Sequence, residues 1–286
     1  MSDYFCRVYR GAPQALHKVL MLVYPDLPYG LLARLSKRRD VFVNGVRCDG
    51  GMVADGSELS LYCTPAMVHL NVVQKEAGLL AVYKPKGVPS DGTYSFEGLV
   101  RYVYGDSVRM LHRLDTNTDG LLLFATDEPT YDLLSAGMRT HTIIKYYRAL
   151  VWGEVDRAQT LRGYLAKDAQ KGRVRIYDAP KEDAVSVACQ VTPLMTDGRM
   201  TVVDICLKGG KTHQLRAQLA HVGHWILGDG KYGNDRINKE YGYRKQQLTS
   251  YRVEIHLSET DSPLDGMVIT LPEDIVDVHL PHGTRE

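Results

Sequence analysis

Two short segments hold charged and hydroxyl side chains where a fold could bring them to one site. In the first, residues 110–124, His112, Arg113 and Asp115 precede a glycine and an apolar run. A carboxylate beside a cation at a loop–strand junction is often functional, because the strand holds the loop in place. The alternative is an aspartate that only caps a turn, and composition alone does not decide between the two.

The second segment, residues 209–216, opens a predicted helix. Its Gly210-Lys211-Thr212 is similar to a phosphate-binding loop, but that motif needs a glycine five positions earlier, where Ile205 stands. His213 and Arg216, three residues apart, share one helix face and can point together toward a site. The segment therefore favours a site with a histidine and an arginine over a nucleoside triphosphatase.

A basic cluster lies near the N-terminus, with Arg34, Lys37, Arg38 and Arg39 at the end of a predicted helix and Asn44 in the turn that follows. Cations beside a tight turn could grip a folded phosphate backbone. The alternative is a solvated helix face whose cations suit the helix dipole. On charge alone the second interpretation is favoured.

The elements that must position these residues form two groups, and we predict domains at residues 1–65 and 66–286. In the first we expect a strand at 4–10, helices from residue 16 and over 29–38, an Asn-Gly hairpin at 41–46 and a strand at 59–62. In the second we expect helices at 96–104, 130–139 and 212–222 and strands at 79–82, 121–124, 143–151, 185–191, 201–207 and 251–257. Because these strands do not alternate with helices, we predict an α+β fold with a mainly antiparallel mixed sheet.

The charge is unevenly distributed along the 286 residues. The net charge is +1, from 35 basic and 34 acidic side chains. Residues 254–286 hold eight acids and one arginine, a charge of −7, which leaves +8 on the rest of the chain. The near-neutral total therefore does not exclude a nucleic-acid partner. Five cysteines without CxxC spacing and the lack of a membrane or signal segment lead us to expect a reduced, cytoplasmic protein.

Four segments, in order, make the chain resemble the RluA-type family of RNA pseudouridine synthases. They are Lys84-Pro85-Lys86-Gly87, His112-Arg113-Leu114-Asp115, the strand Lys145-x-Tyr147-x-Ala149-x-Val151-x-Gly153, and the pair 210–216 and 227–233. The N-terminal unit resembles the small alpha-L RNA-binding domain of a ribosomal protein, through residues 41–45 and Asp55-Gly56. On that resemblance the basic cluster, with Asn44, is expected to bind RNA.

The resemblance implies an enzyme that isomerises uridine in RNA to pseudouridine after flipping the base out of its stack. It makes Asp115 the nucleophile, held by Arg216, and places Tyr147 against the uracil. The implied substrate contacts are His112, Arg113, Leu114, Lys84 and His213, with Arg113 filling the position that the flipped base leaves. No redox step occurs, so we expect no cofactor and no metal.

The expected partner is RNA, with ribosomal RNA favoured and transfer RNA possible. We expect a monomer with no membrane association and no obligatory protein partner. Two alternatives stay open: a non-catalytic RNA-binding adaptor, and a metal-dependent hydrolase. The hydrolase would use Asp115 and His112 with His213, His221 or His224, although their spacing lacks a HExxH frame.

The chain departs from the family pattern at four places. Asp119 stands where serine is usual, Gln218 where histidine is frequent, and Trp225 where proline is usual. Leu248-Thr249-Ser250 replaces a common Leu-His-Ala. None of these changes removes a residue with an implied chemical role. We therefore expect an active enzyme in which the departures alter how the site meets its RNA.

Overall fold

The computed structural model describes residues 4–25, 27, 29–62, 70–92, 95–168, 172–257 and 261–280. It contains two compact units, one of Met1–Asn71 with Val88–Arg109 and one of Val72–Gly87 with Met110–Glu286. The predicted division after residue 65 differs from these units chiefly in one helix, α3 (Phe96–Tyr104). Its Leu99, Tyr102 and Val103 pack against the apolar core of the first unit.

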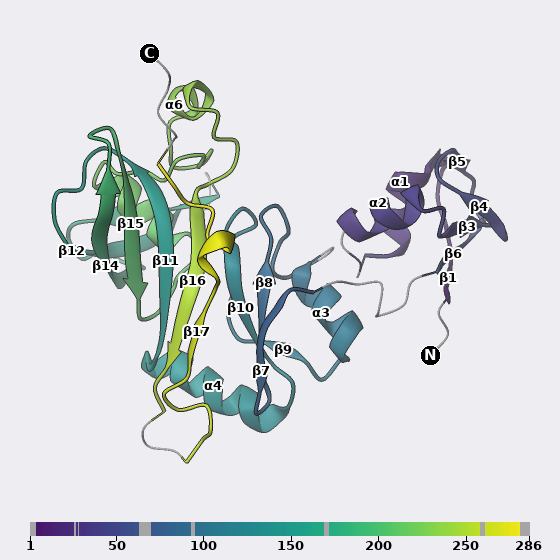
Figure 1. Ribbon diagram of the computed structural model, residues 1–286. Coiled ribbons are helices and arrows are strands. Elements are labelled where there is room, and N and C mark those ends of the chain that lie inside the picture. Colours follow the sequence, from purple (N-terminus) through teal and green to yellow (C-terminus); the bar gives the residue numbers. More distant parts are fainter. Residues whose placement is uncertain are drawn as a thin grey trace. The chain divides into compact units, whose positions relative to one another are not determined.

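The first unit is a small α+β structure built on a four-stranded antiparallel sheet with the order β1-β6-β3-β4 (Figure 1). Leucine and valine side chains of its two N-terminal helices and of β6 form the buried core. The predicted helices, hairpin and last strand are confirmed. The elements up to residue 62 are β1 (Tyr4–Val8), β2 (Gln14–Ala15), α1 (Leu16–Val23), α2 (Tyr29–Lys37), β3 (Val41–Val43), β4 (Val46–Cys48), β5 (Met52–Val53) and β6 (Glu58–Tyr62).

The hairpin between β3 and β4 turns at Asn44 and Gly45, whose φ angles are 50° and 77°. Two consecutive positive φ values are what a two-residue turn of this hand needs, and asparagine followed by glycine adopts them most readily. The Asn44 side chain is also used within the fold, because its Oδ1 accepts a hydrogen bond from the Glu58 amide at 2.8 Å.

The second unit is organised by a large sheet with the strand order β13-β12-β14-β15-β11-β16-β10-β8-β7. Neighbouring strands are antiparallel except β10 and β16, which are parallel, so the predicted α+β class with a mainly antiparallel mixed sheet is confirmed. The strands are β7 (Val72–Glu76), β8 (Leu79–Lys84), β9 (Arg109–Met110), β10 (Asp119–Ala125), β11 (Ile143–Trp152), β12 (Gln159–Asp168), β13 (Arg173–Tyr177), β14 (Val185–Thr196), β15 (Met200–Leu207), β16 (Leu248–Ile255) and β17 (Val268–Thr270).

Helices cover parts of this sheet (Figure 1): α4 (Glu128–Thr140) packs against β10 and β11, and α5 (Gln214–His221) packs against β12 and β13. These two helices match the predicted ones, whereas the short α6 (Asp235–Glu240) and the strands β7, β12, β13 and β17 were not predicted. The described residues include no helix long and apolar enough to cross a membrane.

The parallel contact between β10 and β16 depends on Gly120. Its φ is +115°, and a Cβ there would lie 2.1 Å from the backbone oxygen of Ser250, so only glycine fits. This close approach fixes the start of β10, directly after the loop that carries Asp115.

Candidate active site

Asp115 lies on the loop between β9 and β10, with 24% of its side chain exposed. Its carboxylate oxygen Oδ2 accepts a hydrogen bond from Nη1 of Arg216 at 2.6 Å. The loop turns back on itself, because the Thr118 amide donates to the Asp115 carbonyl at 3.0 Å. The carboxylate is thus fixed by a cation on one side and open to solvent on another.

The end of β8 holds this loop in place. The Gly87 amide donates to the carbonyl of Thr116 at 2.7 Å, and the Lys84 ammonium lies 3.4 Å from the same oxygen. Lys84 is fully buried, and burial lowers its pKa to about 8 although the charges of Asp119 and Asp115 act in the opposite direction. Lys84 therefore supports the Asp115 loop and does not line the pocket, although the resemblance implied a substrate contact.

Arg216, on α5, is held by a second carboxylate. Its Nε and Nη2 donate to the two oxygens of Asp229 at 2.6 and 2.9 Å. Asp229 is 1% exposed and also accepts the amides of Lys231 and Tyr232 at 2.8 and 3.1 Å. Burial alone would raise the pKa of Asp229, but these hydrogen bonds and the arginine charge lower it overall. The two-nitrogen contact fixes the guanidinium plane and aims Nη1 at Asp115.

His213 precedes α5 in a left-handed conformation, with a φ of 54°. Its Nε2 lies 4.0 Å from Oδ2 of Asp115 and its Nδ1 lies 3.1 Å from the Tyr232 hydroxyl. That hydroxyl accepts the Val174 amide at 2.9 Å and can donate its own proton to Nδ1, an arrangement in which the imidazole proton is on Nε2 and faces Asp115. Burial lowers the pKa of His213, in spite of the Asp115 charge, and so favours this neutral form.

Tyr147 and Lys145 point from the same face of β11 and are each 6% exposed. Burial, and then the negative charge of Asp115, raise the pKa of Tyr147 far above its ordinary value. The phenol is therefore neutral at any physiological pH. It presents an apolar ring with a hydroxyl group to the pocket.

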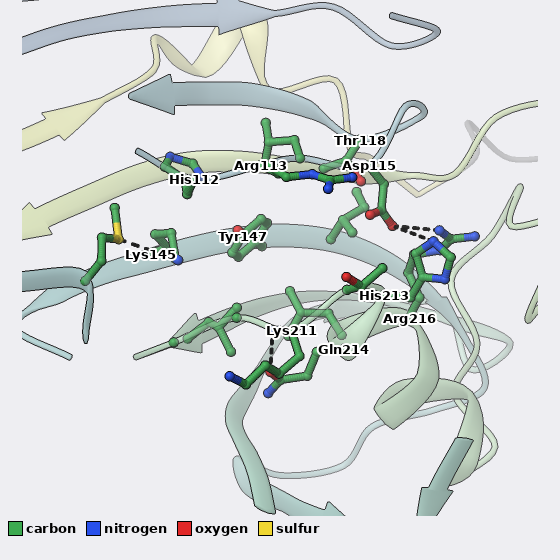
Figure 2. Close-up of a pocket in the computed structure, with 18 of the residues that line it drawn as sticks. His112, Arg113, Asp115, Thr118, Lys145, Tyr147, Lys211, His213, Gln214 and Arg216 are labelled. Atoms are coloured by element: carbon green, nitrogen blue, oxygen red, sulfur yellow. Dashed lines mark hydrogen bonds and ion pairs between the residues drawn. The ribbon is translucent and has the colours of Figure 1, made fainter. Parts of the chain in front are cut away.

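One cavity of about 740 Å³ is lined by Asp115, Lys145, Tyr147, His213 and Arg216 (Figure 2). Asp115 is its only acidic lining residue among the described residues, whereas five lining residues are lysines or arginines: Arg113, Arg139, Lys145, Lys211 and Arg216. A cavity with this imbalance suits a polyanion that also carries a flat, uncharged group.

The structure brings together seven of the sequence-predicted site residues on this cavity: Asp115, Tyr147, Arg216, His112, Arg113, Leu114 and His213. Of these, Arg113 is exposed and Leu114 is buried. Arg34, Lys37, Arg38 and Arg39 are exposed at the end of α2 in the first unit. There Arg38 lies 3.1 Å from Asp40, and Arg39 lies 4.0 Å from Asp49.

His112 is turned toward the sheet. Its Nε2 accepts the Leu123 amide at 3.3 Å, and burial together with the charge of Lys145 lowers its pKa to about 3. The imidazole is thus neutral and bound to β10. This arrangement suits support of the Arg113 backbone better than direct insertion into RNA.

Sequence reasoning missed three residues of the site. Asp229, Tyr232 and Lys145 all fall within segments that resemble the family, but the sequence alone assigns none of them a role. Asp229 and Tyr232 lie on the segment after α5, and nothing in local spacing shows that this segment folds back onto Arg216. The only available signal for Lys145 was its two-residue spacing from Tyr147 in a strand.

The departures from the family pattern at Asp119, Gln218, Thr249 and Ser250 are buried, and Trp225 is half-buried. Asp119 accepts from Thr249 at 2.7 Å, so two of the departures contact each other. Gln218 is 1% exposed and donates to the Leu161 carbonyl at 3.1 Å, while Trp225 stacks on Trp152 with ring centroids 5.7 Å apart. None of Asp119, Gln218, Trp225 and Thr249 lines the cavity.

Among the histidines that the hydrolase alternative offers as a third residue, His213 lies 4.0 Å from Asp115, whereas His221 and His224 have other partners. His221 pairs with Asp178 at 2.8 Å, and His224 contacts the Trp152 carbonyl at 3.0 Å. Within the described part of the chain, no group of three or more histidine, cysteine, aspartate or glutamate side chains is arranged to hold a metal ion.

A family comparison agrees with this geometry. Residues 78–221, half of the chain, match the sequence model of RNA pseudouridylate synthases. The chain belongs to the RNA pseudouridylate synthase family. The match includes Asp115, Tyr147 and Arg216, and it ends before Asp229.

Two curated relatives and one solved structure agree with the family. The chain is 28% identical to the ribosomal large subunit pseudouridine synthase D of Zymomonas mobilis, over 74% of this chain and 72% of the relative. It is also 28% identical to the tRNA pseudouridine synthase C of Yersinia pestis, over 71% of this chain and 85% of that protein. The solved structure of human RNA pseudouridylate synthase domain containing 1 shares the fold, with a TM-score of 0.61 and 21% identity. The likeness covers 71% of this chain and 83% of the human one.

Proposed function

We propose that this pseudouridine synthase isomerises specific uridines in a folded RNA, with ribosomal RNA as the favoured substrate. The observation that carries the proposal is the contact between Asp115 and Arg216, at 2.6 Å, in a cavity whose other charged lining residues are cations. Relatives named for ribosomal RNA and for transfer RNA both support RNA as the substrate class.

Asp115 acts as the nucleophile in this proposal. A carboxylate attacks only when ionised, and the pocket that closes over a base would tend to protonate it by excluding water. The guanidinium of Arg216 opposes this effect and aims the carboxylate, because Asp229 already fixes its plane. Asp115 thus keeps its charge and direction when the uridine enters.

Tyr147 holds the uracil while it is detached from the ribose. The reaction breaks the bond from ribose carbon 1 to the base nitrogen and forms a bond from the same carbon to uracil carbon 5; carbon 5 loses a proton and the freed nitrogen takes one up. The freed base must turn without leaving the site. A buried aromatic ring stacks on a flat base without requiring one orientation, so Tyr147 suits this step.

Arg113 stabilises the RNA from which the uridine is removed. It is exposed at the cavity edge, two residues before Asp115 on the same loop. A planar guanidinium can stack on neighbouring bases in the vacated position and offset part of the flipping cost, which is a few kcal/mol.

The first unit provides a second RNA contact in this proposal. Arg34, Lys37, Arg38 and Arg39 present four cations at one helix end. Such a surface suits the phosphate backbone of a folded RNA, and an added RNA grip favours a large structured substrate. We further propose that the protein acts as a monomer in the cytoplasm.

The direct test is to map pseudouridines in total RNA from cells with and without this protein. The proposal predicts that one or a few positions, in ribosomal RNA first, lose pseudouridine when the protein is absent. They should regain it with the wild-type protein and stay unmodified with Asp115→Asn. An unchanged map in all RNA classes would contradict the proposal.

A further inference from the structure

Lys145 is a charged side chain in an unusual position. It is 6% exposed, it lines the cavity, and the one contact that its ammonium makes within the described part of the chain is with the Met138 sulfur at 4.0 Å. A thioether is a weak acceptor and does not compensate a buried positive charge. The ammonium therefore has no anionic partner among the residues that the structure describes.

The surroundings of Lys145 provide no anion either. Arg139, His141 and Lys211 line the same cavity, and its one described carboxylate, Asp115, is already bound to Arg216. Lys145 also contributes to lowering the pKa of His112, which therefore stays neutral beside it. This end of the cavity is cationic and has no acidic lining residue among those described.

Space next to the ammonium is kept open by Gly210. A Cβ built at this position would lie 3.5 Å from the Lys145 Nζ and 3.7 Å from Leu207. The glycine leaves this volume unfilled beside an ammonium that needs an acceptor.

The position along β11 relates Lys145 to the base site. Tyr147 follows two residues later on the same face, about 7 Å along the strand. In Figure 2 Tyr147 lies between Lys145 and the Asp115–Arg216 pair. The spacing is comparable to that between a base and the phosphates on either side of its own ribose.

We propose that Lys145 is a substrate-positioning residue whose ammonium binds an RNA phosphate next to the flipped uridine, at the end of the cavity opposite Asp115 and Arg216. The inference rests on the proposed function, because it names a further contact of the same site with the same RNA. The phosphate supplies the missing anion, and the buried ammonium determines how far the RNA enters the cavity.

The test uses the full-length enzyme and a synthetic RNA containing the mapped uridine, with the variants Lys145→Met and Lys145→Arg. Methionine has nearly the same shape without the charge, and arginine keeps the charge. Lys145→Met should raise KM about tenfold or more with kcat little changed. It should also reduce the slope of log affinity against log salt by the amount that corresponds to about one phosphate contact. Lys145→Arg should recover part of the lost affinity, and the exposed Lys239→Met on α6 is the matched control.

A second measurement examines the phosphate itself. A neutral methylphosphonate is placed, one position at a time, at the phosphates flanking the target uridine. At one of these positions the methylphosphonate should weaken RNA binding by the wild-type enzyme. At the same position it should not weaken binding by Lys145→Met, relative to the unmodified RNA. The loss in the wild-type enzyme is measured independently of how the variant folds.

The outcomes separate this inference from the proposed function. Unchanged KM and salt dependence in Lys145→Met, or equal effects of the methylphosphonates on both proteins, would overturn the phosphate contact. A fall in kcat at constant KM would overturn it in favour of a proton-transfer role. If the wild-type enzyme forms no pseudouridine in any RNA, the proposed function itself fails.

Discussion

Asp229 accepts hydrogen bonds from two nitrogens of Arg216, Nε at 2.6 Å and Nη2 at 2.9 Å, so that the third nitrogen, Nη1, donates to Asp115. A carboxylate outside the family match thus determines how the arginine meets the proposed nucleophile. Because Asp229 is buried, the arginine cannot easily find a replacement partner in its absence.

We expect Asp229→Asn to lower kcat on the order of 100-fold, because a misdirected guanidinium no longer aims Asp115. The variant should also lose about 3–5 kcal/mol of unfolding free energy, since a buried cation is left partly unpaired. Single-turnover kinetics and urea unfolding measure the two effects. The exposed Asp235→Asn at the start of α6 is the control, and an unaltered kcat in Asp229→Asn would show that Asp229 does not position Arg216.

Thr249 and Asp119 are expected to be energetically coupled, since the threonine hydroxyl donates to the buried carboxylate at 2.7 Å and Tyr83 donates to the same carboxylate at 3.0 Å. In a double-mutant cycle, Asp119→Ala and Thr249→Val should be non-additive by about 0.5–3 kcal/mol. Both tryptophans, Trp152 and Trp225, lie in the second unit, so their fluorescence follows its unfolding alone. Additive effects would mean that the two departures from the family pattern are independent.

The cations at the end of α2 are expected to act on RNA affinity and not on chemistry. Arg34 and Lys37 have no ion pair in the described part of the chain, unlike Arg38 and Arg39. Charge reversal of both, to glutamate, should weaken RNA binding and reduce the slope of log affinity against log salt by about 0.7–0.9 per lost phosphate contact.

The control for this experiment lies in the same unit. Arg10→Glu with Lys18→Glu reverses two other exposed cations, outside the end of α2. The kcat at saturating RNA should stay constant in both double variants. Equal salt slopes for the wild type and the Arg34, Lys37 variant would show that this surface does not contact RNA.

Affinity for RNA is expected to fall as the pH rises through about 8. Burial lowers the pKa of Lys145 to about 8, from 10.5, so the free enzyme loses this charge within the working range. The ammonium binds phosphate and the neutral amine does not, so KM should rise above pH 8. The other charged or titratable groups that line the cavity with Lys145 are His112, Arg113, Asp115, Arg139, His141, Tyr147, Lys211, His213 and Arg216.

The comparison with Lys145→Arg isolates this group, because arginine stays charged up to at least pH 12. The lowered pKa of Lys145 also makes the stability of the fold depend on pH, but stability rises over the range in which RNA affinity falls. The charged lysine is disfavoured in the folded state below pH 8, and this penalty is relieved between pH 8 and 10.5 as the folded state and then the unfolded state lose the proton. A KM with the same pH dependence in the wild type and in Lys145→Arg would contradict the assignment.

Much of the fold could be predicted where one physical signal dominates. The helix at 96–104 matches because Ser95 caps it and an apolar stripe follows, and the Asn44-Gly45 turn matches because few other pairs tolerate its dihedral angles. Strand β12 was missed because Gly163 interrupts its apolar alternation. A Cβ at Gly163 would lie 2.6 Å from Ile176, a contact that local sequence does not reveal.

The site could be predicted as far as its motifs extend. Asp115, Tyr147 and Arg216 were identified from short patterns, and the structure places all three on one cavity. Asp229 and Tyr232 complete the site through contacts set by the path of the chain after α5, which no local spacing encodes. The interior positions of Asp119 and Gln218 likewise depend on tertiary packing.

The central claim is that Asp115 performs the isomerisation. The most direct measurement is hydrogen release from uracil carbon 5 in the mapped RNA, by the wild type and by Asp115→Asn at equal RNA occupancy. We predict release by the wild type and none above background by the variant, with RNA affinity retained in both proteins. Release by Asp115→Asn at a rate close to that of the wild type would contradict the account.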